Sequence, residues 1–200
     1  SWDEPFKRLV NQGMIMGEDG QKMSKRWGNV VNPDDVCAQY GADTLRMYEM
    51  FLGPLTDSKP WNTHGIEGVS RFFGKFWRLF YEGEQWAVNQ EAPTPEELKI
   101  LHKTIKKLTD DLERFSFNTG VSSFMICVNE LTEQKCNNRH ILEQLTILMA
   151  PYAPHICEEI WAQLQPTSPT IFNAEYPVFD PSYLTESSFD YPVSFNGKMR

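Results

Sequence analysis

The sequence predicts a mainly α-helical fold, with an antiparallel helical bundle over residues 62–165. Apolar residues recur at steps of three and four along consecutive segments, which is typical of helices with one buried face. The links between these segments are short, so neighbouring helices are expected to run antiparallel as four to five members of one bundle. A chain of 200 residues is long enough to bury such a core without a covalent staple.

The residues before the bundle predict a short strand and a polar loop. Val10–Met16 has the composition of a strand, and Gly17–Gly20 that of the turn after it. Residues Gln21–Asn29 are polar, basic and bounded by glycines, as is typical of loops. We expect the glycines at both ends of this loop to act as hinges: Gly17, Gly20 and Gly28.

Two short helices are predicted next. Asn32-Pro33-Asp34-Asp35 combines a capping residue, a first-turn proline and two acids at the positive end of the helix dipole. This helix is expected to end at Gly41, and a second one to run from Ala42 or Asp43 to Gly53-Pro54. Residues 53–62 form a connector.

Four longer helical segments follow. The second begins with a capping box, Thr94 and Glu97, and Pro151 and Pro154 break or kink the fourth. The buried stripes are predicted to be Ile66, Val69, Phe73, Phe76, Trp77 and Phe80; Leu98, Leu101, Ile105, Leu108 and Leu112; Val121, Phe124, Val128 and Leu131, in a helix from Phe117; and, from about Asn138, Ile141, Leu145 and Leu148, continued by Ile156, Ile160, Trp161 and Leu164.

Five prolines after Gln165 predict an extended tail over residues 166–200. Within it, Tyr191–Lys198 alternates like a strand entering a turn, and we expect it to begin a further domain. The chain starts at Ser1 without an initiator methionine and stops in mid-pattern at Arg200, as a piece of a longer protein would.

Composition narrows the function. The chain has 19 Lys and Arg against 27 Asp and Glu, a net charge of −8, which excludes a generally basic nucleic-acid coat but not a local cationic site. It has no membrane-length apolar run and no signal segment, so we expect a cytoplasmic protein without a membrane partner. The four cysteines and four histidines lack metal-ligand spacing, so we expect no metal site and reduced thiols.

The candidate chemistry lies in the loop. Lys22, Lys25 and Arg26, with the Ser24 hydroxyl, put three cations within five residues, and such a cluster can neutralise a polyphosphate. On the residues alone, a solvated basic turn is the alternative.

The string Lys22-Met23-Ser24-Lys25-Arg26 resembles the "KMSKS" loop of class I aminoacyl-tRNA synthetases. Gly28-Asn29, Gly41–Phe51, Pro60-Trp61-Asn62 and Ala150–His155 continue the likeness, which covers nearly all of the chain and is greatest to the bacterial leucyl-tRNA synthetases. The equivalent part of a valyl-, isoleucyl- or methionyl-tRNA synthetase, and a non-catalytic helical tRNA-binding or assembly module, are the alternatives.

The resemblance implies a division of the chain. Residues 1–61 would be the end of a Rossmann-like catalytic domain, 62–165 an anticodon-binding-type bundle, and 166–200 a tail and the start of a truncated C-terminal domain. The "HIGH" signature, the leucine pocket and the editing domain would lie upstream, so this fragment is not expected to be active alone.

It also implies substrates and site residues. In the family, leucine and ATP, with its Mg²⁺, form leucyl-adenylate, and the leucyl group passes to tRNA(Leu). Lys22 and Lys25 would be the catalytic lysines at the ATP phosphates, with Met23 packing on the catalytic domain and Ser24 setting the loop conformation. Arg26 departs from the usual serine and would face phosphate, tRNA or solvent.

Two basic strips are candidates for tRNA contact, and no DNA partner is expected. Arg71, Lys75 and Arg78 step by four and three, so they share one helix face. The second strip is better explained as solubilising charge: Lys99, Lys103, Lys106 and Lys107.

Overall fold

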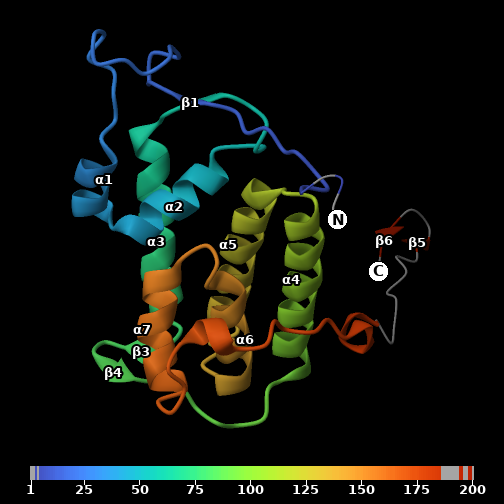
Figure 1. Ribbon diagram of the computed structural model, residues 1–200. Helices are drawn as coiled ribbons and strands as arrows, with labels where there is room; N and C mark the ends of the chain where they lie inside the picture. The colour runs from blue at the N-terminus through green and yellow to red at the C-terminus, as the bar shows by residue number, and fades with distance from the viewer. Residues whose placement is uncertain (1–2, 4, 186–193, 196–197, 200) are drawn as a thin grey trace.

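The computed structural model describes residues 3, 5–185, 194–195 and 198–199, and confirms the mainly helical prediction (Figure 1). Its helices are α1 Pro33–Tyr40, α2 Ala42–Phe51, α3 Thr63–Trp77, α4 Pro95–Glu113, α5 Phe117–Glu133, α6 Arg139–Met149 and α7 Pro154–Leu164. In the described part of the chain, no helix is both long and apolar enough to cross a membrane.

The strands are short and pair two by two. β1 (Ile15–Met16) runs parallel to β2 (Lys59–Pro60), so the start of the chain is joined to the connector before α3. β3 (Tyr81–Glu82) and β4 (Gln85–Trp86) form an antiparallel hairpin that the sequence analysis did not predict. β5 (Ser194–Phe195) pairs with β6 (Lys198–Met199); the rest of the predicted Tyr191–Lys198 strand and turn lies outside the described residues.

The helices begin where their capping residues predict. Asn32 caps α1 by accepting from the Asp34 N–H, and Thr94 and Glu97 form the reciprocal capping box at the start of α4. Asn138 caps α6. Pro151 and Pro154 break the last predicted helix, so α6 and α7 are separate elements.

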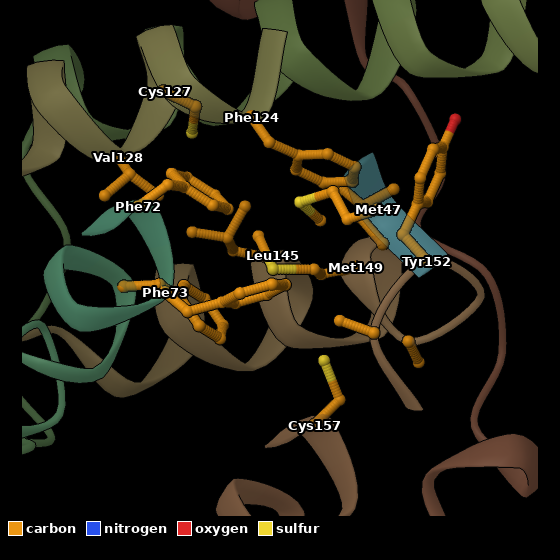
Figure 2. Close-up of a cluster of buried hydrophobic side chains, with 14 of the residues drawn as sticks. Met47, Phe72, Phe73, Phe124, Cys127, Val128, Leu145, Met149, Tyr152 and Cys157 are labelled. Carbon is orange, nitrogen blue, oxygen red and sulfur yellow. The ribbon is translucent and has the colours of Figure 1, made fainter. Parts of the chain in front are cut away.

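The core gathers buried side chains from all seven described helices, and Figure 2 shows one part of it. Phe72 and Phe73 of α3 face Phe124 and Val128 of α5, and Leu145 and Met149 of α6 lie between them. Met47 of α2 and Cys157 of α7 complete the cluster, and both are fully buried. Because α2 contributes Met47 to this core, it packs as a member of the bundle although it precedes residue 62.

The four cysteines are free thiols in the structure, and three of them are buried. Burial raises the pKa of Cys127 and Cys136 to about 12, and it also raises the pKa of Cys157 well above its usual value. These thiols are therefore protonated packing groups at neutral pH.

The described part of the tail crosses α4. It contains two short 3₁₀ turns, η1 (Ile171–Asn173) and η2 (Pro181–Leu184), and η2 contacts α4. His102 of α4 is buried beneath it: its Nδ1 accepts a hydrogen bond from the Asp180 N–H at 3.1 Å, and its ring stacks on Tyr183 with centroids 4.4 Å apart.

Candidate functional site

The loop of Lys22–Arg26 lies among the blue segments that project beyond α1 in Figure 1. The side chains of Lys22, Lys25 and Arg26 are exposed, while Met23 is half-buried and packs against the hydrophobic core. The two lysines that the sequence analysis singled out are therefore free to meet a ligand from solvent.

Short-range hydrogen bonds shape the loop after Met23. The Ser24 hydroxyl accepts from the Arg26 N–H at 3.2 Å, and the Ser24 carbonyl accepts from the Trp27 N–H at 3.0 Å. The Arg26 guanidinium lies over the Trp27 ring, 5.2 Å from its centroid, so it stacks on a neighbour within the loop. Gly28 then adopts a positive φ of 66°, a conformation that costs a side-chain-bearing residue energy.

A carboxamide joins the loop to the turn before it. The Asn29 Oδ1 accepts from the Ser24 N–H at 2.8 Å, while its Nδ2 lies 3.1 Å from each Asp19 carboxylate oxygen and 3.4 Å from the Lys22 carbonyl. The Asp19 carboxylate also accepts from the Gln21 N–H. The Gln21 backbone bond, then that from Asn29, lowers the pKa of Asp19.

The same turn is tied to the start of α3. The Glu18 carboxylate accepts from the Thr63 hydroxyl at 2.6 Å and from the Thr63 N–H at 3.3 Å. These two bonds lower the pKa of Glu18. A continuous chain of contacts thus runs from the lysine loop through Asn29, Asp19 and Glu18 to the first residue of α3.

The basic strip of Arg71, Lys75 and Arg78 lies near the other end of α3, and all three side chains are exposed. Lys75 donates to the Asn129 amide oxygen at 3.0 Å. Among the ion pairs of residues 5–185, none involves these three cations. A hollow of about 640 Å³ beside Lys75 and Arg78 is also lined by Lys135, Asn137 and Tyr81, and by two carboxylates, Glu82 and Glu133.

The second basic strip is largely neutralised by neighbouring acids. Lys103 lies 3.7 Å from Glu130, Lys106 lies 3.0 Å from Asp110, and Lys107 pairs with the buried Asp111. These pairs favour the interpretation of this strip as surface charge, and they leave the α3 strip as the more available one.

Among the described residues, no group of three His, Cys, Asp or Glu side chains has the geometry to hold a metal ion. Sequence reasoning named the lysines but missed the roles of Asp19 and Glu18. It quoted Asn29 only as part of a motif, although a polar residue after a glycine turn is a signal for side-chain bonding to the loop.

Two family descriptions match the chain. Residues 1–59 match "tRNA synthetases class I (I, L, M and V)", and residues 97–200 match "Anticodon-binding domain of tRNA ligase". Together they cover both the lysine loop and most of the bundle.

Individual relatives are named leucine–tRNA ligase. The chain is 61% identical to that of Christiangramia forsetii over 97% of this chain, and 59% identical to that of Flavobacterium johnsoniae over all of it. It spans about a fifth of the length of these relatives, 20% and 21%. The structure also matches all of this chain, at 30% identity and a TM-score of 0.80, to 27% of a chain in the ternary complex of Agrobacterium radiobacter K84 agnB2 LeuRS with tRNA and LeuAMS.

The loop, the helices after it and the bundle match the same family over the whole chain. The chain belongs to the leucine–tRNA ligase family of class I tRNA synthetases.

Proposed function

We propose that this chain is the part of a leucine–tRNA ligase that contacts the ATP phosphates and supports the tRNA. Residues 1–61 would end the catalytic domain, 62–165 would form the tRNA-binding bundle, and 166–200 would begin the next domain. The observation that carries the proposal is the exposure of Lys22 and Lys25 on a loop whose backbone is held by Asn29. The enzyme would act in the cytoplasm.

The lysines would act in the activation step. An oxygen of the leucine carboxylate attacks the α-phosphorus of ATP, the bond to the β-phosphate oxygen breaks, and pyrophosphate leaves with the bonding electrons. Two ammonium groups beside the departing phosphates stabilise the charge that grows there. A hydroxyl of the terminal tRNA adenosine then takes the leucyl group and AMP leaves. Mg²⁺ would enter bound to ATP.

The α3 strip would meet the tRNA backbone. Arg71, Lys75 and Arg78 present three charges along one exposed face, and none of them forms an ion pair in residues 5–185. Cations of this kind bind phosphates without reading base sequence, so they would position the tRNA body.

Lys25→Ala in the full-length ligase tests the loop. We expect leucine-dependent ATP–pyrophosphate exchange to fall at least tenfold while the bundle stays folded, since Lys25 is exposed. A change below about threefold, which is less than 1 kcal/mol of barrier, would mean that Lys25 does not meet the phosphates. The 200-residue chain alone should show no pyrophosphate exchange. Detectable exchange would refute the proposal that it holds only part of an active site.

A triple alanine variant at Arg71, Lys75 and Arg78 tests the strip. We expect weaker tRNA(Leu) binding and a salt dependence whose slope shrinks by about one for each lost phosphate contact. Lys103→Ala with Lys106→Ala is the matched control, because both lysines pair with acids, and it should leave the slope unchanged. Equal effects of both variants would indicate general charge attraction. If the triple variant loses tRNA binding while Lys25→Ala keeps its pyrophosphate exchange, the non-catalytic tRNA-binding module is favoured.

A further inference from the structure

The side chain of Asn29 occupies a site that only a carboxamide satisfies. Its oxygen must accept from the Ser24 N–H, and its nitrogen must donate both to Asp19 and to the Lys22 carbonyl. An aspartate offers no donor and an aliphatic side chain offers neither group, whereas a carboxamide carries one acceptor and two N–H donors. The distances of 2.8, 3.1 and 3.1 Å describe normal hydrogen bonds, and the 3.4 Å contact to Lys22 is a weaker one.

The surroundings of Asn29 are built to receive it. At Gly17, which the sequence analysis took as a hinge, a Cβ atom would lie 2.7 Å from the Asp19 Oδ1 and 2.9 Å from the Asn29 Nδ2. Because the buried Gly17 has no Cβ, it leaves room for the side chains of Asp19 and Asn29 to meet. Asp19 is fixed in turn by the Gln21 N–H at 3.0 Å.

These contacts fix the loop backbone on both sides of Met23 and leave the lysine side chains exposed. We propose that Asn29, braced by Asp19, is a positioning residue: it holds the backbone at Lys22 and Ser24 so that Lys22 and Lys25 present their charges at one place. The inference rests on the proposed function of the loop, and it adds the group that sets the lysines' position. A loop already held in place loses less entropy when its cations meet the phosphates, so the loss of Asn29 affects the activation step.

The test uses four variants of the full-length ligase: Asn29→Ala, Asn29→Asp, Asp19→Asn, and the double variant Asp19→Asn/Asn29→Asp. Asn29→Ala removes all the contacts, and we expect pyrophosphate exchange to fall about tenfold or more in kcat. Asn29→Asp sets two carboxylates about 3 Å apart and should fall at least as far. The double variant restores a donor–acceptor pair between positions 19 and 29, but an aspartate at 29 cannot donate to the Lys22 carbonyl. Its activity should therefore exceed that of Asn29→Asp by about threefold or more and stay below that of the parent.

Asn32→Ala is the matched control, because Asn32 is a nearby asparagine that caps α1 and does not hold the loop. The rate of pyrophosphate exchange of Asn32→Ala should stay within threefold of that of the parent. In the 200-residue chain, amide hydrogen exchange should speed up at Ser24 in Asn29→Ala and remain unchanged in α3. If Asn29→Ala fails to fold, the comparison of the double variant with Asn29→Asp decides instead.

The outcomes separate the two proposals. Loss in Lys25→Ala with Asn29→Ala within threefold of the parent overturns the positioning role and leaves the loop function standing. A double variant that is no more active than Asn29→Asp overturns the positioning role as well. If Lys25→Ala is silent, the loop function fails, and with it the statement that Asn29 acts through the lysines.

Discussion

Asp43→Ala should destabilise the chain by about 2–4 kcal/mol, because Asp43 caps a helix far from it in sequence. The capping position of α7 is Ala153, which has no side chain to accept from the first turn. Asp43, at the start of α2, takes that role instead: its carboxylate accepts from the Ile156 N–H at 2.7 Å, from the His155 N–H at 3.3 Å and from the His155 Nδ1 at 2.8 Å.

The magnitude follows from these three bonds. Hydrogen bonds to a charged group each contribute about 1.5–3 kcal/mol when buried, and a lost helix cap costs about 0.5–2 kcal/mol. Asp43 is only 9% exposed, but the His155 side chain is 72% exposed, so water replaces part of what is lost. Asp43→Asn keeps the shape and loses the charge at the helix dipole and one acceptor, so we expect about 1–2 kcal/mol.

Urea unfolding followed by circular dichroism measures the effect as a change in unfolding free energy at constant slope. Asp35→Ala is the control, because Asp35 is an exposed acid in the first turn of α1, and it should change stability by less than about 0.5 kcal/mol. An Asp43→Ala chain within 0.5 kcal/mol of the parent would show that α7 does not depend on α2 for its cap.

Four further outcomes are expected from urea unfolding. The Tyr152 hydroxyl is buried without a partner among the described residues, so Tyr152→Phe should stabilise the chain by about 1 kcal/mol. Burial raises the pKa of Tyr152 to about 12, so the parent should lose stability between pH 10 and 12, where the unfolded chain loses the proton more readily. Tyr152→Phe should remove that loss. Gly120→Ala would place a Cβ 2.7 Å from that hydroxyl and should cost about 1–3 kcal/mol, less when combined with Tyr152→Phe. Thr94→Ala removes half of the capping box and should cost about 1 kcal/mol. Burial lowers the pKa of His102, so the unfolded chain binds the proton more readily and stability should fall as pH drops below about 6.5. His102→Gln should make this fall smaller, and an unchanged pH profile would contradict the prediction.

The helices were predictable because their signals are local. Asn32, Thr94 and Asn138 lie next to the backbone groups that they cap, and the apolar stripes of α4 and α5 follow from a spacing of three and four residues. The lysine loop was predictable for a different reason, since its five residues resemble a family motif.

The long-range contacts were not predictable in this way. The bond between Asp43 and Ile156 joins residues 113 positions apart, and nothing near Ala153 in sequence indicates where its missing cap comes from. The place of Met47 in the core and the meeting of Asn29 with Asp19 likewise depend on how the chain folds back. Periodicity identifies the buried face of a helix, but it does not identify the group that covers that face.

Helix α3 connects the basic strip of Arg71, Lys75 and Arg78 with the contacts that hold the lysine loop. Its first residue holds Glu18, and its last turn carries Lys75, with about 22 Å of hydrogen-bonded rod between the two ends. Because a helix of this length moves as a unit, a displacement of the end that carries Lys75 would also move Thr63, and through Glu18 it would reach the turn that holds the loop. The helix thus connects the basic strip with the lysine loop, and the buried Phe72 and Phe73 hold its middle in the core.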